Sequence, residues 1–207
     1  MASIYEVAMA AQAGVHMVGL VGPMPTGPGT LSLEVAADLA ESAPATVTTV
    51  FLSASPDAEG LSQDLYAVRP HVVQIVRHVA PSVHRDLAET WPAVQRLQVI
   101  HVEGPEAVDL IKDYGDGPDA FLLDSGRLAA DELGGTGRVH DWSISRACVE
   151  ATTKPVFLAG GLTPENVGAA IAAVRPAGID VCSGVRSDGK LDAGKLLAFI
   201  AAITEAS

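Results

Sequence analysis

The chain has 207 residues, of which 48% are hydrophobic, and this suits one sizeable core and excludes a disordered chain. Its formal net charge of −12 argues against binding nucleic acid or an anionic membrane through bulk electrostatics. No apolar run approaches the roughly 18 residues that span a bilayer, no signal peptide is recognisable, and Cys148 and Cys182 are too few for a disulfide scaffold, so we expect a cytoplasmic protein with free thiols.

Short apolar runs alternate with helical patterns along the chain. Most runs are nearly continuously apolar, which is typical of strands in a parallel sheet covered by helices. The predicted strands are 15–21, 45–52, 71–76, 97–102, 119–124, 154–160 and 178–184. The predicted helices are 3–13, 32–42, 57–67, 82–90, 104–113, 141–150, 164–174 and 190–203. We expect Ser32, Asp141 and Thr163 to cap three of them, the last before a proline at the first helical position.

The alternation of seven strands with eight helices continues without a break in composition, so we expect a single domain over residues 1–207. Such a pattern forms either a (β/α)8 barrel or an open doubly wound sheet. No G-x-G-x-x-G motif opens the first helix, which weakens the dinucleotide-binding version of the open sheet, and the TIM-barrel type is the other outcome.

The last two predicted strands end in glycine-containing segments, AGG at 159–161 and SGV at 183–185. In a β/α barrel, the loops after the last two strands commonly bind a phosphate. Glycine lets backbone amides approach the oxygens, and a helix N-terminus adds partial positive charge. We therefore expect a phosphate cup made of Gly160, Gly161, Ser183 and Gly184. The alternative is that the glycines only serve tight turns.

A third glycine-rich segment spans residues 126–142. Loops of this length are usually functional or mobile. We expect its GGTG stretch, 134–137, to fold over a ligand, with Gly135 among the binding residues, and the alternative is a surface loop without a role. His140, next to Asp141, is expected to be a loop residue at a helix cap.

These late segments resemble phosphoribosylanthranilate isomerase, a (β/α)8 barrel of the tryptophan pathway. The resemblance is strong over residues 119–200, whereas in the first half only 4–21 and 72–74, the latter with Gln74, resemble the family. The resembling late stretches, in matching order and spacing, are FLLDSG (121–126), GGTGRVHDW (134–142), KPVFLAGGLTPENV (154–167) and VRPAGIDVCSGV (174–185).

The resemblance implies an isomerase that acts on a phosphorylated ribosyl sugar. Asp124 matches the family's general acid, which protonates the ribose ring oxygen while the aminoaldose opens. A base then removes the proton from C2, and the resulting enol settles as a ketose. Asp180 matches a family aspartate near the anthranilate amine. The alternative for Asp124 is a cap on the next turn.

The first half departs from the family pattern. The family begins with a strand whose cysteine is the general base, and this chain is expected to start after that strand. The family's S-P-R-Y stands here as residues 27–30, and its V-Q-L-H-G as residues 73–77. These departures argue against straightforward isomerisation of phosphoribosylanthranilate. They leave three alternatives: a related isomerase, a lyase or cyclase that uses the same cup, or a non-catalytic binder or partner subunit.

Two residues are candidate bases in place of the family cysteine. Cys182 lies two residues after Asp180, so on a strand both would share a face, near the anion-binding cup; the alternative is a packing residue. His101 lies at the C-terminal end of the predicted strand 97–102, where a histidine is a natural proton shuttle, and Glu103 and His78 are rivals. The sequence lacks H-E-x-x-H and C-x-x-C spacing, so we expect no metal and no cofactor.

A barrel that lacks one strand exposes two strand edges. Direct pairing of those edges, a segment of a second copy, or another protein would cover them. A homodimer or a partner protein that closes the gap is therefore among the expectations.

Overall fold

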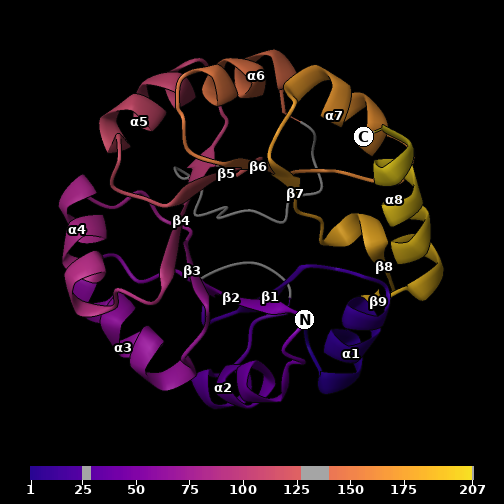
Figure 1. Ribbon diagram of the computed structural model, residues 1–207, viewed down its shortest axis with the longest axis horizontal. Coiled ribbons are helices and arrows are strands. Elements are labelled where there is room, and N and C mark those ends of the chain that lie inside the picture. Colours follow the sequence, from indigo (N-terminus) through magenta and orange to yellow (C-terminus); the bar gives the residue numbers. More distant parts are fainter. Residues whose placement is uncertain (25–28, 127–139, 207) are drawn as a thin grey trace. The chain divides into compact units, whose positions relative to one another are not determined.

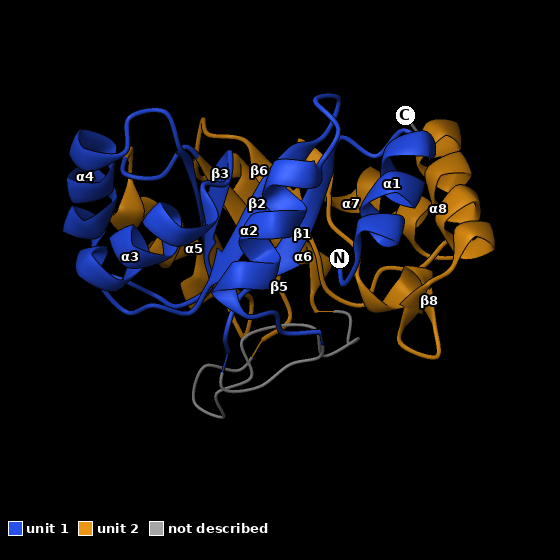
Figure 2. Cartoon of the chain, turned by 90° about the horizontal axis from the view of Figure 1, so that it is seen from below, with its two compact units in different colours: residues 1–98, 117–119 blue, residues 99–116, 120–207 orange. Residues whose placement is uncertain are grey.

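The structure is a computed structural model that describes residues 1–24, 29–126 and 140–206. The chain divides into two compact units. The first comprises Met1–Gln98 with Gly117–Asp119, and the second comprises Val99–Asp116 with Ala120–Ser207 (Figure 2). The expectation of one domain stays a prediction, and each unit is described by itself.

In the first unit, four parallel strands pair with their neighbours in chain order. Helices α2 and α3 lie side by side and pack on β1 and β2 (Figure 1). Ser32 caps α2 as predicted, because its Oγ accepts a hydrogen bond from the Val35 N–H at 3.3 Å. The elements are α1 (Ile4–Gln12), β1 (Met17–Val21), α2 (Leu33–Ser42), β2 (Thr48–Ser53), α3 (Ala58–Val68), β3 (Val72–Ile75), α4 (Pro81–Thr90) and β4 (Gln95–His101), whose last three residues belong to the second unit.

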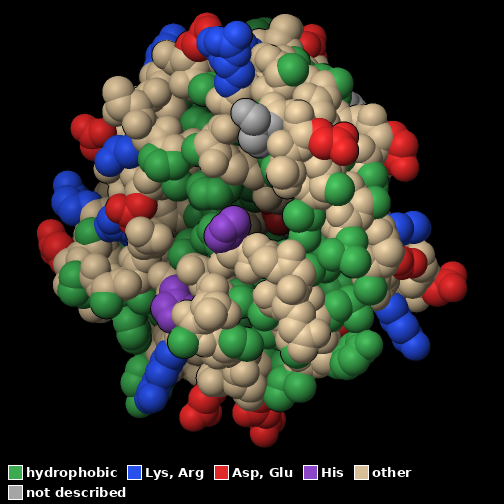
Figure 3. Space-filling view, turned by 45° about the vertical axis from the view of Figure 1, so that its right-hand side comes forward, with side chains coloured by type: hydrophobic (Ala, Val, Ile, Leu, Met, Phe, Trp, Pro, Cys, Tyr) green, Lys and Arg blue, Asp and Glu red, His purple; other side chains and the backbone are tan. Residues whose placement is uncertain are grey.

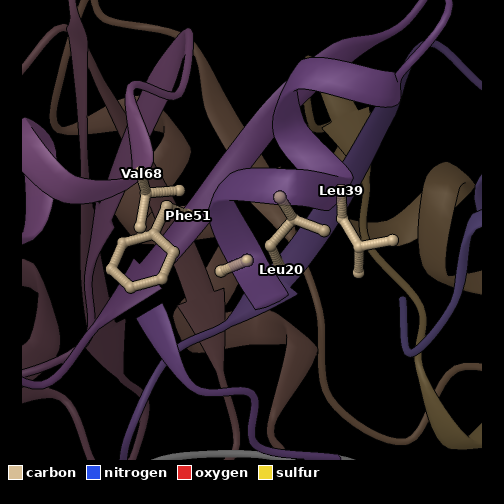
Figure 4. Close-up of a cluster of buried hydrophobic side chains, with 5 residues drawn as sticks. Leu20, Leu39, Phe51 and Val68 are labelled. Atoms are coloured by element: carbon tan, nitrogen blue, oxygen red, sulfur yellow. The ribbon is translucent and has the colours of Figure 1, made fainter. Parts of the chain in front are cut away.

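A hydrophobic cluster holds this helix layer on the strands (Figure 4). Leu20 of β1 and Phe51 of β2 are register partners, and both are fully buried. Leu39 of α2 and Val68 of α3 pack against them. Full burial of each large side chain contributes about 2–3 kcal/mol, so the apolar runs that predicted these strands also fix which face the helices cover.

In the second unit, β5, β6 and β7 are again parallel and paired in chain order. Helices α5, α6 and α7 lie along one face of these strands (Figure 1). The elements are α5 (Glu106–Tyr114), β5 (Ala120–Asp124), α6 (Trp142–Glu150), β6 (Val156–Leu158), α7 (Val167–Val174), β7 (Gly178–Ile179), the 3-10 helix η2 (Ser183–Val185), β8 (Arg186–Ser187), β9 (Lys190–Leu191) and α8 (Ala193–Ala206).

The seven predicted parallel strands and eight predicted α-helices are all present among residues 1–24, 29–126 and 140–206. A doubly wound sheet reverses its strand order around the first strand, whereas the strands of each unit here follow the chain order. The order is that of a β/α barrel, as expected.

Three boundaries in the last third differ from the sequence prediction. The strand expected over 178–184 ends at Ile179, because the chain turns into η2 after Cys182 leaves the extended region. The last helix begins at residue 193, since residues 186–191 form a hairpin whose turn, Asp188 and Gly189, takes φ of 51° and 76°. The helix expected from Pro164 begins at Val167, and its N-cap residue is Asn166. The prediction of Thr163 as the cap is therefore wrong.

Side-chain charge is scattered over the surface in Figure 3, where Lys and Arg side chains on the visible face are separated from one another by other groups. None of the helices in the described ranges has the length and apolar character needed to cross a membrane.

Candidate active site

The chain leaves β6 through two glycines in a left-handed conformation. Gly160 has φ of 86° and Gly161 has φ of 62°, a region that residues with a side chain rarely adopt. A Cβ atom on Gly160 would lie 2.9 Å from Ser125 Oγ and 3.1 Å from His140 Nδ1. Both the backbone conformation and the close approach of these two polar atoms therefore require glycine at position 160.

Asn166 fixes the turn that follows. Its Oδ1 accepts a hydrogen bond from the Thr163 N–H at 2.8 Å, and its Nδ2 donates to the Gly161 carbonyl at 3.0 Å. Because both bonds go to backbone atoms, the side chain holds the shape of residues 161–163 regardless of the neighbouring side chains. Sequence reasoning missed this role. The available signal was an asparagine just before an apolar helical run, a position that favours capping residues.

The segment after β7 lies directly against the segment after β6. A Cβ atom on Gly184 would come within 1.9 Å of the Leu162 carbonyl oxygen and 3.2 Å of the Thr163 Cα. The two backbones touch at this point, and only glycine leaves room for the contact. The structure thus brings together the two glycine segments that the sequence analysis assigned to one cup.

The N–H groups of the predicted phosphate cup are available to a ligand. Across the part of the chain that the structure describes, the amides of Gly160, Gly161, Ser183 and Gly184 donate to no backbone or side-chain acceptor. Ser183 is exposed and the three glycines are half-buried, so solvent reaches this region. Clustered unpaired amides form an anion-binding concavity without any cationic side chain. The arrangement suits a phosphate on an acidic protein.

Two carboxylates lie at the ends of the neighbouring strands. Asp124 is the last residue of β5, and its Oδ1 accepts a hydrogen bond from the Ser125 N–H at 2.7 Å. Asp180 directly follows β7, and its N–H continues the ladder by donating to the Leu158 carbonyl at 2.9 Å. Asp180 is an exposed residue, but neighbouring protein atoms desolvate its carboxyl group. This desolvation, with the negative charge of Asp124, raises the pKa of Asp180 to about 6.

Cys182 and His101 occupy different settings. Cys182 is exposed and lies beside Ser183 of the cup. The expectation that it shares a face with Asp180 does not apply, because the strand has ended before both residues. His101 is the last residue of β4 and is 3% exposed, with Glu103 N–H bonded to its carbonyl oxygen. The role of either residue as a base stays a prediction.

The remaining predicted site residues lie either in the first unit or outside the described residues. Gln74 is in β3 of the first unit and is 8% exposed. Gly135 and the GGTG segment fall outside the described residues, as do Gly27 and Pro28. Among the residues described, no three His, Cys, Asp or Glu side chains are grouped closely enough to hold a metal ion.

His140 is a loop residue directly before the Asp141 cap of α6, as predicted. Its contacts were not predicted: its Nε2 forms a 2.7 Å hydrogen bond with the Oγ of Ser145, which is fully buried in α6. Burial lowers the pKa of His140 to about 4, opposed by the nearby Asp141. Its Nδ1 lies beside Gly160. No sequence signal separates this position from that of a histidine at a solvent-exposed cap.

The family model described as N-(5'phosphoribosyl)anthranilate (PRA) isomerase matches residues 2–202 of the chain. The chain belongs to the PRA isomerase family. The Methanosarcina mazei protein named N-(5'-phosphoribosyl)anthranilate isomerase 2 is 36% identical over 199 residues, which cover 95% of this chain and 88% of that protein. The expectation that departures in the first half argue against PRA isomerase activity finds no support in these matches, because they run through the first half as well.

Solved structures of PRA isomerases share the fold. That of Thermococcus kodakaraensis is 28% identical, has a TM-score of 0.81, and covers 98% of this chain and 95% of that chain. A second, in complex with reduced 1-(o-carboxyphenylamino)-1-deoxyribulose 5-phosphate, is 24% identical, has a TM-score of 0.82, and covers 99% of this chain and 95% of that chain. The α/β fold of the TIM-barrel type, which the family resemblance implied, is confirmed for this member of the PRA isomerase family.

Proposed function

We propose that this protein is a PRA isomerase, which converts the aminoaldose phosphoribosylanthranilate into the corresponding ketose. The observation that supports this most directly is the set of four unpaired amides of the predicted phosphate cup, in the same unit as the carboxylate pair Asp124 and Asp180. The cup provides a site for the 5'-phosphate. The carboxylates provide a proton where the sugar ring opens.

In the proposed reaction, Asp124 donates a proton to the ribose ring oxygen as the bond from that oxygen to C1 breaks. The nitrogen lone pair forms the C1=N bond of an iminium ion. A base then removes the proton from C2, and its electron pair neutralises the iminium to give an enol amine. Protonation at C1 and loss of the hydroxyl proton at C2 yield the ketose. The product is an isomer of the substrate, and every proton added is balanced by one removed, so no co-reactant is consumed.

Asp180 has a supporting role in this proposal. Its pKa of about 6 lies well above the usual value of an aspartate, and the charge of Asp124 contributes to the shift. Two carboxylates that interact in this way hold a proton between them at a higher pH than either would alone. Asp180 therefore keeps a proton near Asp124 and faces the amine nitrogen, whose bonding changes in the reaction.

The test is steady-state turnover of phosphoribosylanthranilate by the full chain and by Asp124→Asn. We expect Asp124→Asn to lower kcat by at least about 100-fold, the usual contribution of a general acid, while leaving the thermal stabilisation by the reduced ketose analogue intact. Asp188→Asn is the matched control, since Asp188 lies exposed at the hairpin turn with φ of 51°, which asparagine also adopts.

The results for the wild type and the variants decide between an isomerase and a non-catalytic binder, and identify the acid and the base. Stabilisation by the analogue without turnover by the wild-type protein would leave a non-catalytic binder and exclude the isomerase. Turnover that survives in Asp124→Asn would exclude Asp124 as the acid. Replacement of Cys182 by Ser and of His101 by Asn, in separate variants, identifies the base, because only loss of the base removes exchange of the C2 proton with solvent.

A further inference from the structure

One polar atom at the end of β6 has no role in the reaction described above. The Nδ1 of His140 is buried, and among the residues that the structure describes it has no hydrogen-bond partner. Buried polar atoms are nearly always paired, because an unpaired one costs about 1–3 kcal/mol of desolvation. An unpaired ring nitrogen on the loop of a ligand site therefore indicates a partner that arrives with the ligand.

The ring is held in place by its other nitrogen. Nε2 lies 2.7 Å from Ser145 Oγ, and Ser145 is anchored in α6 with no exposed surface. Burial keeps the pKa of His140 at about 4, so the imidazole is neutral at physiological pH. A neutral imidazole carries one N–H and one bare nitrogen. When the Ser145 hydroxyl donates to Nε2, the ring proton is on Nδ1.

The position of Nδ1 identifies what it faces. It lies 3.1 Å from the point that a Cβ atom on Gly160 would occupy. Gly160 is one of the four residues whose amides are unpaired in the phosphate cup. A donor on Nδ1 is therefore adjacent to amide donors that suit the same anion, and it adds a neutral side-chain donor to a cup otherwise made of backbone.

We propose that His140 Nδ1–H donates a hydrogen bond to a phosphate oxygen of the ligand held by the cup, with Ser145 fixing the ring in the required tautomer. The proposal deepens the proposed function, since it rests on a phosphorylated ligand in the same cup. It makes His140 a direct binding residue and Ser145 a positioning residue.

Two isosteric variants separate this role from a structural one. The amide of Asn places its nitrogen near the position of Nδ1, whereas the amide of Gln reaches the position of Nε2. In titration calorimetry with inorganic phosphate, we expect His140→Gln to raise Kd by about 10-fold or more and His140→Asn to raise it by less than about 3-fold, as for loss and retention of one hydrogen bond to a charged group. Ser145→Ala should raise Kd by an intermediate factor, because the tautomer is no longer fixed.

The reverse order, with His140→Gln unaffected and His140→Asn weakened, would show that only the bond to Ser145 matters and would overturn the proposal. Equal Kd values for both variants and the wild type would overturn it too. Should the variants fail to fold, ¹⁵N spectra of the histidines in the wild-type protein decide. An Nδ1–H tautomer whose signal shifts on addition of phosphate supports the proposal, and an Nε2–H tautomer excludes it.

The experiments distinguish a failure of the proposed function from a failure of this inference. Binding of phosphate with the expected order of variants, but no turnover of phosphoribosylanthranilate, would exclude the isomerase and leave His140 in place. Turnover with phosphate binding that is insensitive to position 140 would do the opposite. A wild-type protein that binds neither phosphate nor the reduced ketose analogue would exclude the cup, and His140 with it.

Discussion

The Asp180 carboxyl group has a pKa of about 6, raised by desolvation and by the negative charge of Asp124. The folded protein therefore binds a proton there over a range in which the unfolded chain has lost it. The contribution of Asp180 to stability therefore falls as the pH rises from about 4 to about 6, and the penalty is fully present above that range. The raised pKa that keeps a proton available on Asp180 therefore lowers the stability of the folded protein.

Asp180→Asn is expected to remove this penalty. The variant should melt at a higher temperature than the wild type at pH 7 and at the same temperature near pH 4, because the amide is neutral throughout. Thermal melts between pH 4 and pH 8 measure the difference. Asp188→Asn, the exposed turn variant, should show a constant offset across the range. A constant offset in Asp180→Asn as well would contradict the raised pKa.

His84 contributes a pH dependence of the opposite sign. It is fully buried, its Nε2 lies 3.0 Å from Gln98 Oε1, and burial lowers its pKa to about 4, with the Gln98 bond and the charge of Asp119 opposing and that of Arg96 adding to the shift. The unfolded chain binds the proton first, so stability is complete above pH 6.5 and is lost as the pH falls towards 4.

His84→Gln keeps a donor for Gln98 and removes the titration. Relative to this variant, the wild-type protein should lose up to about 3 kcal/mol between pH 6.5 and pH 4. Urea unfolding at a series of pH values measures the difference. Parallel stability curves for the two proteins would show that His84 does not control acid stability.

At the scale of the elements, the contact between the loops after β6 and β7 is the feature most sensitive to a single atom. A methyl group on Gly184 would lie 1.9 Å from the Leu162 carbonyl oxygen. We expect Gly184→Ala to destabilise the protein by about 3 kcal/mol, the upper range for overpacking, and to weaken phosphate binding because the loops must separate. Differential scanning calorimetry with and without phosphate measures both effects.

Gly168→Ala is the matched control for this substitution. Gly168 lies in α7, where an added Cβ would meet the Ala206 Cβ at an ordinary 3.7 Å. Alanine is the better helix former, so this variant should be as stable as the wild type or more stable by up to about 1 kcal/mol. Equal melting temperatures for both glycine variants would show that the loops do not meet as described.

The sequence was most informative about elements and least informative about their ends. Runs such as 119–124 predicted strands because buried parallel strands are continuously apolar. The run 178–184 looked equally continuous, yet the strand stops at Ile179, and the chain turns into η2 after Cys182. The hairpin at 186–191 was missed because its strands are two residues each, too short for periodicity.

The residues of the site were also only partly predictable from the sequence. Gly160, Gly161 and Gly184 were predictable, since glycine marks positive φ or close approach and two such segments ended consecutive strands. The contacts of Asn166 and His140 were not predictable, because they depend on which backbone atoms and which side chain lie opposite these residues. Those partners, Gly161 and Ser145, become visible only once the chain is folded.

At the scale of the whole molecule, neither compact unit is a contiguous piece of chain. The boundary falls inside β4, between Gln98 and Val99, and residues 117–119 return to the first unit. There Asp119 pairs with Arg96 through both carboxylate oxygens, at 2.7 and 2.8 Å. This pair ties residues 117–119 to the first unit, and a unit that unfolded alone would have to break β4 in its middle.

We therefore expect a single unfolding transition. The ratio of calorimetric to van't Hoff enthalpy should be one, as for a two-state domain, and phosphate should shift the whole transition upwards. A ratio well above one, or a transition of which phosphate shifts only a part, would contradict the prediction of a single domain over residues 1–207.

The two cysteines differ in exposure, so the reactivity of one thiol can report whether the predicted phosphate cup is occupied. Cys148 is fully buried in α6, and burial raises the pKa of its thiol to about 11, whereas Cys182 is exposed beside Ser183 and Gly184. A thiol reagent should therefore label one sulfur per chain quickly, without any engineered tag. Phosphate in the cup should slow that labelling, so the rate reads out occupancy directly, even for ligands that are never turned over.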